Sequence, residues 1–268
     1  MLRRAVLAAV VALLLLPGLA AAQKPITLWH VFNLDTDIIY IGIKSFNESQ
    51  NTHRIEPRLV PANQLSAELI KAIATGSVPD LVTIDNPNVA SFAAQGSLTD
   101  LTDRVKASAV IKPEVYFQGP WASGVWKGHF YAVPRDANTL ALCYNADMFR
   151  AKGLDPTKPP ATWSELVADA TKLRDADKNA FGFGFSAMQA EEGVFQWLPF
   201  LYQAGGSIDH LDSPEAAESL QLLVDFVKSG VASKDVINER QYEVTNTFMA
   251  GNAAMVLCGP LGAATPAT

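Results

Sequence analysis

Two loops of the sequence place planar polar side chains where α/β proteins bind their ligands. His30 and Asn33 follow one apolar segment rich in β-formers, and Asp85 and Asn88 follow another. Carboxylate and amide groups bind pairs of hydroxyl groups through hydrogen bonds, which charge strengthens. The loops at the carboxyl ends of parallel strands are the usual place for such groups. We therefore take these four residues as candidates for contact with a polar ligand.

These polar stretches also have purely structural alternatives. Residues 85–88, Asp-Asn-Pro-Asn, are equally typical of a turn that caps the next helix. A third polar stretch runs from Arg135 to Asn138. Its alternative is a surface ion pair between Arg135 and Asp136, which would contribute little energy. For this third stretch we favour a binding role.

Motifs that would indicate catalysis are missing from the sequence. Residues 182–185, Gly-Phe-Gly-Phe, lack the rest of a dinucleotide fingerprint, and no Gly-x-Ser-x-Gly elbow occurs. The histidines His30, His53, His129 and His210 show no short metal-binding spacing. No carboxylate pair stands out as an acid/base couple. The sequence thus favours a binding protein, not an enzyme, and predicts no cofactor and no metal.

The first 22 residues have the form of an export signal. A basic start precedes an apolar run from Ala5 to Leu16, and Ala20-Ala21-Ala22 supplies the small residues that a signal peptidase requires. The run is shorter than the roughly 20 residues of a membrane-spanning helix, so an anchored N-terminal helix is the weaker alternative. We expect cleavage near Ala22 and a periplasmic product.

The chain that would remain after cleavage is acidic. It carries 19 Lys and Arg against 27 Asp and Glu, a net charge of −8. Such a surface argues against binding nucleic acid through its phosphates, and against a basic membrane-surface protein. The length suits one large domain or two lobes of about 100–150 residues each.

Strand and helix patterns alternate along the chain, which is typical of parallel sheets covered by helices. Glycines mark the ends of several predicted helices, among them Gly76 and Gly230. The predicted strands cover residues 26–31, 54–60, 80–84, 130–133, 140–144, 181–185 and 253–257. The predicted helices cover residues 35–50, 63–75, 89–95, 146–152, 163–174, 195–203, 214–230 and 241–250.

The two cysteines, Cys143 and Cys258, allow two interpretations. An even count in an oxidising compartment invites a disulfide. Each cysteine also lies in an apolar, strand-like run, where a buried thiol usually just packs. The second interpretation is the one we favour.

Several short stretches occur in an order typical of one family. They are Ile26–His30, Pro79–Val82, Gln95–Leu101, Tyr144–Phe149, Gly153–Pro156, Pro160–Leu166, Ala204–Gly206, Phe248–Met255 and Gly259-Pro260. Behind the export signal, this order resembles the extracellular solute-binding proteins of ABC importers, family 1. That group includes the maltose-binding and glycerol-phosphate-binding proteins. Together the stretches span nearly the whole mature chain.

The resemblance implies a periplasmic-binding-protein-like α/β fold of type II, with two α/β lobes joined at a hinge. Lobe one would cover residues 23–138 and lobe two residues 139–260, with the ligand in the cleft. Residues 261–268 would form a tail at the second crossover. Because members are usually longer, the resemblance also implies a C-terminally truncated chain whose lobe one is incomplete.

The resemblance implies further ligand contacts. The family commonly places a polar contact at the position of Asn138, and Glu192 and Trp197 match a loop and a helix start near the cleft. Trp197 could equally belong to the core. Gly259 begins the Gly-Pro pair, after which many sugar binders have an aromatic residue that stacks on the ligand. Here Leu261 stands there, which argues against an extended oligosaccharide.

The function implied is capture of a small solute, above all a sugar, by a monomeric protein that serves an ABC permease of the inner membrane. Glycerol phosphate, a polyamine or another polar solute are the alternatives within this class. A secreted α/β hydrolase is the alternative from another class, and the missing nucleophile elbow argues against it.

Overall fold

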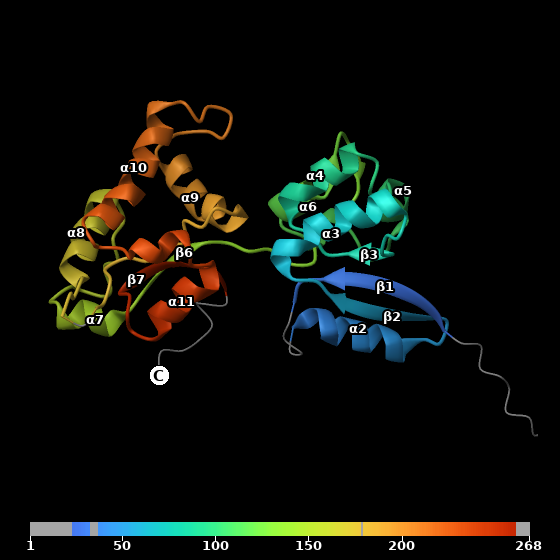
Figure 1. Ribbon diagram of the computed structural model, residues 1–268, viewed down its shortest axis with the longest axis horizontal. Coiled ribbons are helices and arrows are strands. Elements are labelled where there is room, and N and C mark those ends of the chain that lie inside the picture. Colours follow the sequence, from blue (N-terminus) through green and yellow to red (C-terminus); the bar gives the residue numbers. More distant parts are fainter. Residues whose placement is uncertain (1–22, 33–36, 178, 261–268) are drawn as a thin grey trace, which may run out of the picture. The chain divides into compact units, whose positions relative to one another are not determined.

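The computed structural model describes residues 23–32, 37–177 and 179–260. The chain divides into two compact units, the first ending at Asp136 and the second beginning at Ala137, and each is described by itself (Figure 1). None of the helices in these ranges combines the length and the apolar character needed to cross a membrane. The predicted export signal and the residues Asn33 and Leu261 lie outside the described residues.

The first unit is built on a short parallel sheet. Strand β1 (Lys24–His30) lies between β2 (His53–Leu59) and β3 (Leu81–Val82) and pairs in parallel with both. The parallel arrangement that the sequence pattern predicts is therefore confirmed in this unit.

Helices cover both faces of this sheet. Helix α2 (Ile38–Ser49) packs on one face around Leu28, and helix α3 (Ala62–Thr75) packs on the other around Trp29 (Figure 1). Successive residues of a strand point to opposite faces, so these two neighbours belong to separate clusters. The buried members are Trp29, Val60, Leu65 and Ala72 on one face and Leu28, Ile39 and Ile43 on the other.

The rest of the first unit consists of short elements. They are α4 (Asn86–Ala94), α5 (Thr102–Ala107), η1 (Pro113–Val115), α6 (Gln118–Ser123) and the hairpin of β4 (Val125–Trp126) and β5 (His129–Phe130). The sequence pattern did not predict α5, α6 or β4, which span six, six and two residues and show little periodicity.

The second unit contains an antiparallel strand pair, β6 (Ala141–Tyr144) with β7 (Met255–Cys258). Its helices are α7 (Ala146–Ala151), α8 (Trp163–Leu173), α9 (Glu191–Gln203), α10 (Pro214–Lys228), η2 (Lys234–Ile237) and α11 (Gln241–Met249). Helix α10 ends before Gly230, whose φ of +73° is left-handed, as the predicted glycine stop requires.

The predicted strand at residues 181–185 is wrong as a regular strand. Only two isolated bridges form there, Phe181 with Ala253 and Gly184 with Val256. The physical reason lies in its glycines, because a Cβ atom at Gly182 would lie 1.8 Å from the Ala170 carbonyl oxygen. The segment therefore approaches its neighbours too closely for an ordinary ladder of side chains.

One continuous aromatic core holds the second unit together. Phe183 is fully buried, and its ring centroid lies 5.1 Å from that of Phe226 and 5.8 Å from that of Phe185. Residues from β6 and β7 and from helices α7 to α10 pack around this centre. Buried aromatic groups of this kind supply much of the apolar area removed from water on folding.

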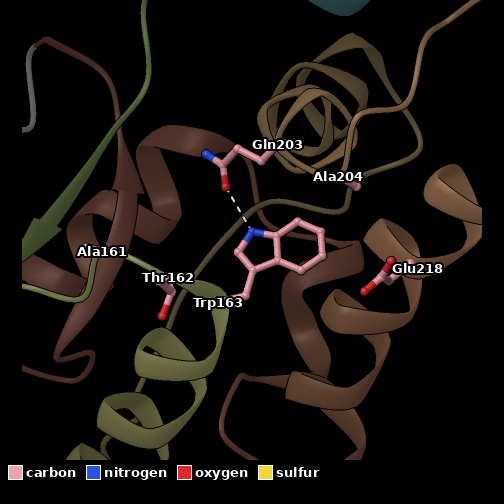
Figure 2. A pocket seen from close by; sticks show the side chains of 6 residues that line it. All are labelled: Ala161, Thr162, Trp163, Gln203, Ala204 and Glu218. Carbon is pink, nitrogen blue, oxygen red and sulfur yellow. Dashed lines mark hydrogen bonds between the residues drawn. The ribbon is translucent and has the colours of Figure 1, made fainter.

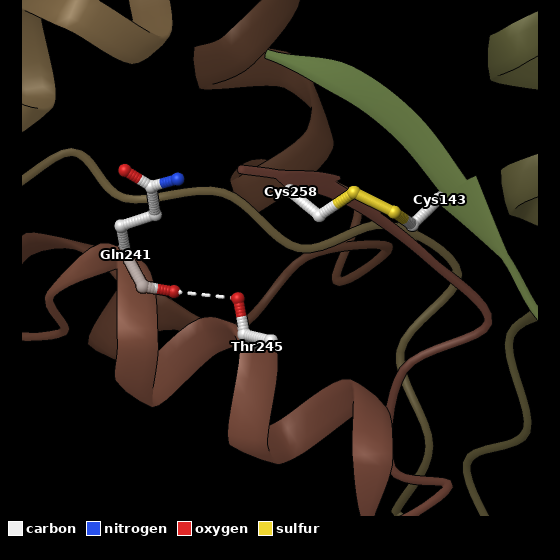
Figure 3. The surroundings of a disulfide bond; sticks show 4 residues. All are labelled: Cys143, Gln241, Thr245 and Cys258. Carbon is white, nitrogen blue, oxygen red and sulfur yellow. Dashed lines mark hydrogen bonds between the residues drawn. A yellow bond between two sulfur atoms is a disulfide. The ribbon is translucent and has the colours of Figure 1, made fainter. Parts of the chain in front are cut away.

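Strands β6 and β7 are also joined covalently. Cys143 and Cys258 form a disulfide with their Cα atoms 5.9 Å apart (Figure 3). The expectation that both cysteines merely pack was wrong, because antiparallel pairing of Cys143 with Val256 and of Ala141 with Cys258 brings them within bridging distance. The bridge spans 115 residues of sequence, which is nearly the whole unit.

Candidate functional site

His30 ends β1 at the carboxyl edge of the parallel sheet. Backbone hydrogen bonds continue the sheet around it, since Val60 N donates to His30 O at 2.8 Å and Thr83 N donates to Trp29 O at 2.9 Å. The His30 ring nitrogens and the Thr83 hydroxyl are buried and have no hydrogen-bond partner among the described residues. The sheet edge therefore carries two buried polar side chains.

The imidazole of His30 lies among aromatic rings. It stacks parallel to Phe32 at 6.5 Å and meets Tyr40 edge-on at 5.2 Å between centroids. Burial lowers the pKa of His30, and the nearby Asp37 carboxylate only partly opposes that effect. The ring is therefore neutral near pH 7.

Arg135 is fixed by three neighbours within the first unit. Its Nη1 donates to Asp37 Oδ1 at 2.9 Å, its Nη2 contacts Asp136, and its Cζ lies 3.7 Å from the centroid of the Phe32 ring. Asp37 also caps helix α2, because its Oδ1 accepts from Ile39 N at 2.9 Å. The guanidinium is thus held in place, and two carboxylates balance its charge.

Asp85 and Asn88 lie at the start of α4. Asp85 stands at the N-cap position, yet its carboxylate accepts no hydrogen bond from the helix. Only the backbone joins the two residues, since Asn88 N donates to Asp85 O at 3.0 Å. Among the described residues the exposed carboxylate of Asp85 has no hydrogen bond or ion pair, so it is available to a ligand.

The second unit gathers Asn138 and Gly259 around Gln241. Asn138 Nδ2 donates to Gln241 Oε1 at 3.2 Å. A Cβ atom at position 259 would lie 2.6 Å from Gln241 Nε2 and 2.8 Å from Asn138 Oδ1, so the two amides approach the backbone closely only because this residue is glycine. Gln241 begins α11, and its carbonyl accepts from Thr245 Oγ1 at 2.9 Å (Figure 3).

Glu192 reaches the same group from α9. Its Oε2 accepts from Gln241 N at 3.3 Å, and its Oε1 lies 3.5 Å from Arg240 Nη1. A carboxylate at the N-terminus of α11 is favourable, because the helix dipole is positive there. We call Asn138, Glu192, Arg240, Gln241 and Gly259 the amide group; it offers both donors and acceptors to a polar molecule.

Trp197 lies apart from the amide group. Its Nε1 donates to Ser219 Oγ at 2.8 Å, and its ring packs against the aromatic core. Ser219 is fully buried. The structure therefore places Trp197 at the core, which is the alternative that the sequence left open.

Sequence reasoning missed Gln241 and Arg240. The signal that could have found them is the predicted start of a helix at residue 241, where side chains and backbone N–H groups gather at one end. The pattern could not show that the β6–β7 pairing brings Gly259 and Asn138 to that helix end. It likewise gave no sign that Asp37 would hold Arg135.

The fold and these side chains define a class of protein. Polar groups at the carboxyl edge of a parallel sheet, with a second α/β unit that presents an amide group, are typical of α/β proteins that bind small polar molecules. The solved structures that the chain resembles have the type II periplasmic-binding-protein fold. A family model described as bacterial extracellular solute-binding protein matches residues 33–266, and the chain belongs to this family.

Three relatives illustrate the likeness. The sn-glycerol-3-phosphate-binding periplasmic protein UgpB of Escherichia coli is 28% identical over 260 residues, which is 90% of this chain. A Thermotoga lettingae solute-binding protein, solved with α-D-tagatose, is 27% identical with a TM-score of 0.79 over 90% of the chain. An Agrobacterium radiobacter solute-binding protein, solved with ribitol, is 27% identical with a TM-score of 0.79 over 91% of the chain.

The chain spans only part of each of these relatives. The match covers 58% of the Escherichia coli protein and 63% of each of the two solved chains. These relatives are named as binding proteins for transport, not as enzymes.

Proposed function

We propose that this protein is the substrate-binding component of an ABC importer and captures an uncharged polyhydroxylated solute, a sugar or a sugar alcohol. The observation that carries the proposal is the amide group, in which Asn138, Gln241 and Glu192 present planar acceptors and donors beside Gly259. Planar amides and carboxylates suit pairs of neighbouring hydroxyl groups. The tagatose and ribitol in the two solved relatives belong to this chemical class.

The ion pairs of the candidate site favour an uncharged solute. Asp37 and Asp136 balance Arg135, and Glu192 balances Arg240. A phosphate monoester would have to compete with these carboxylates for a guanidinium, and the negative charges nearby would repel it. Glycerol phosphate remains the second candidate, because the Escherichia coli relative is named for it.

Family membership supports the wider setting that we propose. We expect the protein to work in the periplasm as a monomer, to deliver its solute to a permease in the inner membrane, and to leave the solute chemically unchanged. Within this proposal the amide group of the second unit contacts the solute. Release of a nitrophenol from a nitrophenyl glycoside would contradict the absence of catalysis.

Isothermal titration calorimetry of residues 23–268 tests the proposal. The ligand panel is D-tagatose, ribitol, maltose, sn-glycerol 3-phosphate and spermidine. We expect heat from at least one uncharged member, and Gln241→Ala should weaken that binding about tenfold or more by removing hydrogen bonds to the solute. Gln221→Ala is the matched control, because the side chain of Gln221 donates to Asp225 on the same helix, α10, and does not belong to the amide group.

The outcomes separate the two candidates. Binding of glycerol phosphate alone would replace the first candidate by the second. No heat with any ligand, from a chain that still unfolds cooperatively, would reject both. An equal loss of affinity in Gln221→Ala would remove the amide group as the site.

A further inference from the structure

A pocket of about 480 Å³ opens on the second unit, and none of the candidate-site residues lines it (Figure 2). Its volume lies within the range of small-molecule sites. The lining comes from the start of α8, the end of α9 and the second turn of α10. The lining residues are Ala161, Thr162, Trp163, Gln203, Ala204 and Glu218.

Trp163 supplies an aromatic surface at the centre of this pocket. Its Nε1 donates to Gln203 Oε1 at 2.8 Å, and its ring lies 6.1 Å from that of Phe200 between centroids. Both contacts fix the indole, which stands between Gln203 and Glu218 in Figure 2. The neighbouring end of α8 offers little to an anion, because Thr162 and Glu165 already form a complete capping box there.

Three acceptor groups of the lining residues make no hydrogen bond within the described chain. One is the carboxylate of Glu218, which is exposed and forms no ion pair with the described residues either. The other two are the backbone carbonyl oxygens of Gln203 and Ala204 at the end of α9. The C-terminus of a helix is the negative end of its dipole. No Lys, Arg or His lines the pocket.

The net charge of the second unit also favours a cationic ligand. Residues 137–268 carry 16 Asp and Glu against 9 Lys and Arg, whereas residues 23–136 carry 11 against 10. The second unit therefore holds a net charge of −7, out of −8 for residues 23–268. A field of this sign raises the local concentration of cations.

We propose that this pocket binds an organic cation, a guanidinium or primary ammonium group carried on an apolar stem. The cation lies over the face of Trp163 and pairs with the Glu218 carboxylate, and its remaining N–H groups meet the free carbonyls of α9. The stem covers Ala161 and Ala204. A free diamine and an Arg or Lys side chain of a partner protein share this chemistry. The site is independent of the amide group and of sugar binding.

Nitrogen-15 NMR of the indole N–H groups tests the site in residues 23–268. The Trp163 signal is identified by its loss in Trp163→Leu. Agmatine should move this signal saturably, and N-butylurea, which is planar but uncharged, should not. Glu218→Gln should weaken agmatine binding about tenfold, because it removes the ion pair and keeps the shape of the side chain. Glu215→Gln on the same helix is the matched control, since Glu215 does not line the pocket.

The comparison with a peptide identifies the source of the cation. If acetyl-Gly-Arg-Gly-amide binds at least tenfold more tightly than agmatine, the site accepts a protein side chain; equal or weaker binding indicates a free amine, and both results support the cation site. Equal binding of N-butylurea and agmatine would overturn the proposal. So would a Glu218→Gln variant that binds agmatine as the unchanged chain does.

Discussion

The two units of this protein hold their polar side chains in place by different means. In the second unit 15 buried apolar residues form one continuous core among the described residues, whereas the first unit has clusters of four and three on the two faces of a sheet. The amide group is positioned by close backbone packing at Gly259, but Arg135 is positioned by ion pairs and a ring contact. Packing is insensitive to salt, whereas ion pairs at partly exposed positions are screened.

The first unit also exposes large apolar side chains. Phe117 is 83% exposed and Val110 is 77% exposed. Few buried contacts and much exposed apolar surface are features of a region of low local stability. We therefore expect the first unit to open more readily than the second.

The largest effect should come from the centre of the aromatic core. Phe183→Ala removes a fully buried ring and leaves a cavity, so it should lower the free energy of unfolding of the second unit by about 3–5 kcal/mol. Hydrogen exchange read by mass spectrometry reports each unit separately. Leu220→Ala, at a half-exposed position of α10, is the control. If exchange in the first unit accelerates as much as exchange in the second, the stabilisation by Phe183 is not confined to the second unit.

Loss of the disulfide should have the next largest effect. Cys143→Ala with Cys258→Ala should cost the second unit about 2–4 kcal/mol, because the unfolded chain is no longer closed into a loop. Reduction of the unchanged protein should give the same shift in its denaturation midpoint. If hydrogen exchange in the first unit accelerates equally, the disulfide does not stabilise the second unit alone, as its position between β6 and β7 predicts.

Gly259→Ala should affect binding more than folding. The new Cβ atom would push Gln241 and Asn138 apart, so solute affinity should fall at least tenfold, which is roughly 1.4 kcal/mol. Gly42→Ala in α2 is the contrasting variant, since a Cβ atom there meets nothing within 4 Å. It should stabilise the first unit by about 0.5–1 kcal/mol. Calorimetry measures the solute affinity of Gly259→Ala, and thermal unfolding measures the stability of Gly42→Ala. An unchanged affinity in Gly259→Ala would mean that the amide group does not bind the solute.

The smallest effect should be a pH dependence of opposite sign in the two units. The pKa of His30 is lowered by burial, so the unfolded first unit takes up a proton that the folded one does not, and its stability falls as the pH drops below about 6.5. Burial raises the pKa values of Glu239 and Asp169, so the folded second unit holds protons at these two groups that the unfolded chain releases, and their contribution to its stability rises as the pH falls from 7 to 5.

Hydrogen exchange at both pH values, corrected for the intrinsic rate, measures this dependence. Asp100, whose pKa is lowered to about 2 chiefly by hydrogen bonds from Thr102, adds a loss in the first unit only below about pH 4. His30→Gln should flatten the slope of the first unit between pH 7 and 5. Slopes of the same sign in both units would contradict the assignment.

The first unit could be predicted largely from local patterns. The expected strands at 26–31 and 54–60 and the helix at 63–75 differ from β1, β2 and α3 by at most two residues at either end. Alternation and helical periodicity are properties of neighbouring residues, so they can be read without knowing the fold. The glycine stop at Gly76 was equally local, and its φ of +70° agrees with it.

The second unit shows what local sequence patterns cannot predict. Its main helices and the strands β6 and β7 were predicted, but the pairing of these two strands was not, because they lie more than a hundred residues apart in the sequence. The disulfide and the amide group both depend on that pairing. Sequence reasoning could therefore propose Asn138 and Gly259 as single positions, while Gln241, which joins them, emerges only from the folded chain.

The second unit begins and ends at one place. The backbone of Gly259 lies against the side chain of Asn138, and the Cys143–Cys258 bridge closes the chain just inside these two positions. Residues 137–260 thus have the geometry of an insertion cassette, whose adjacent ends fit into a surface loop of a host protein without stretching it. Such a cassette also tolerates a cut in its own loops, since the sulfur bridge would keep the two pieces together.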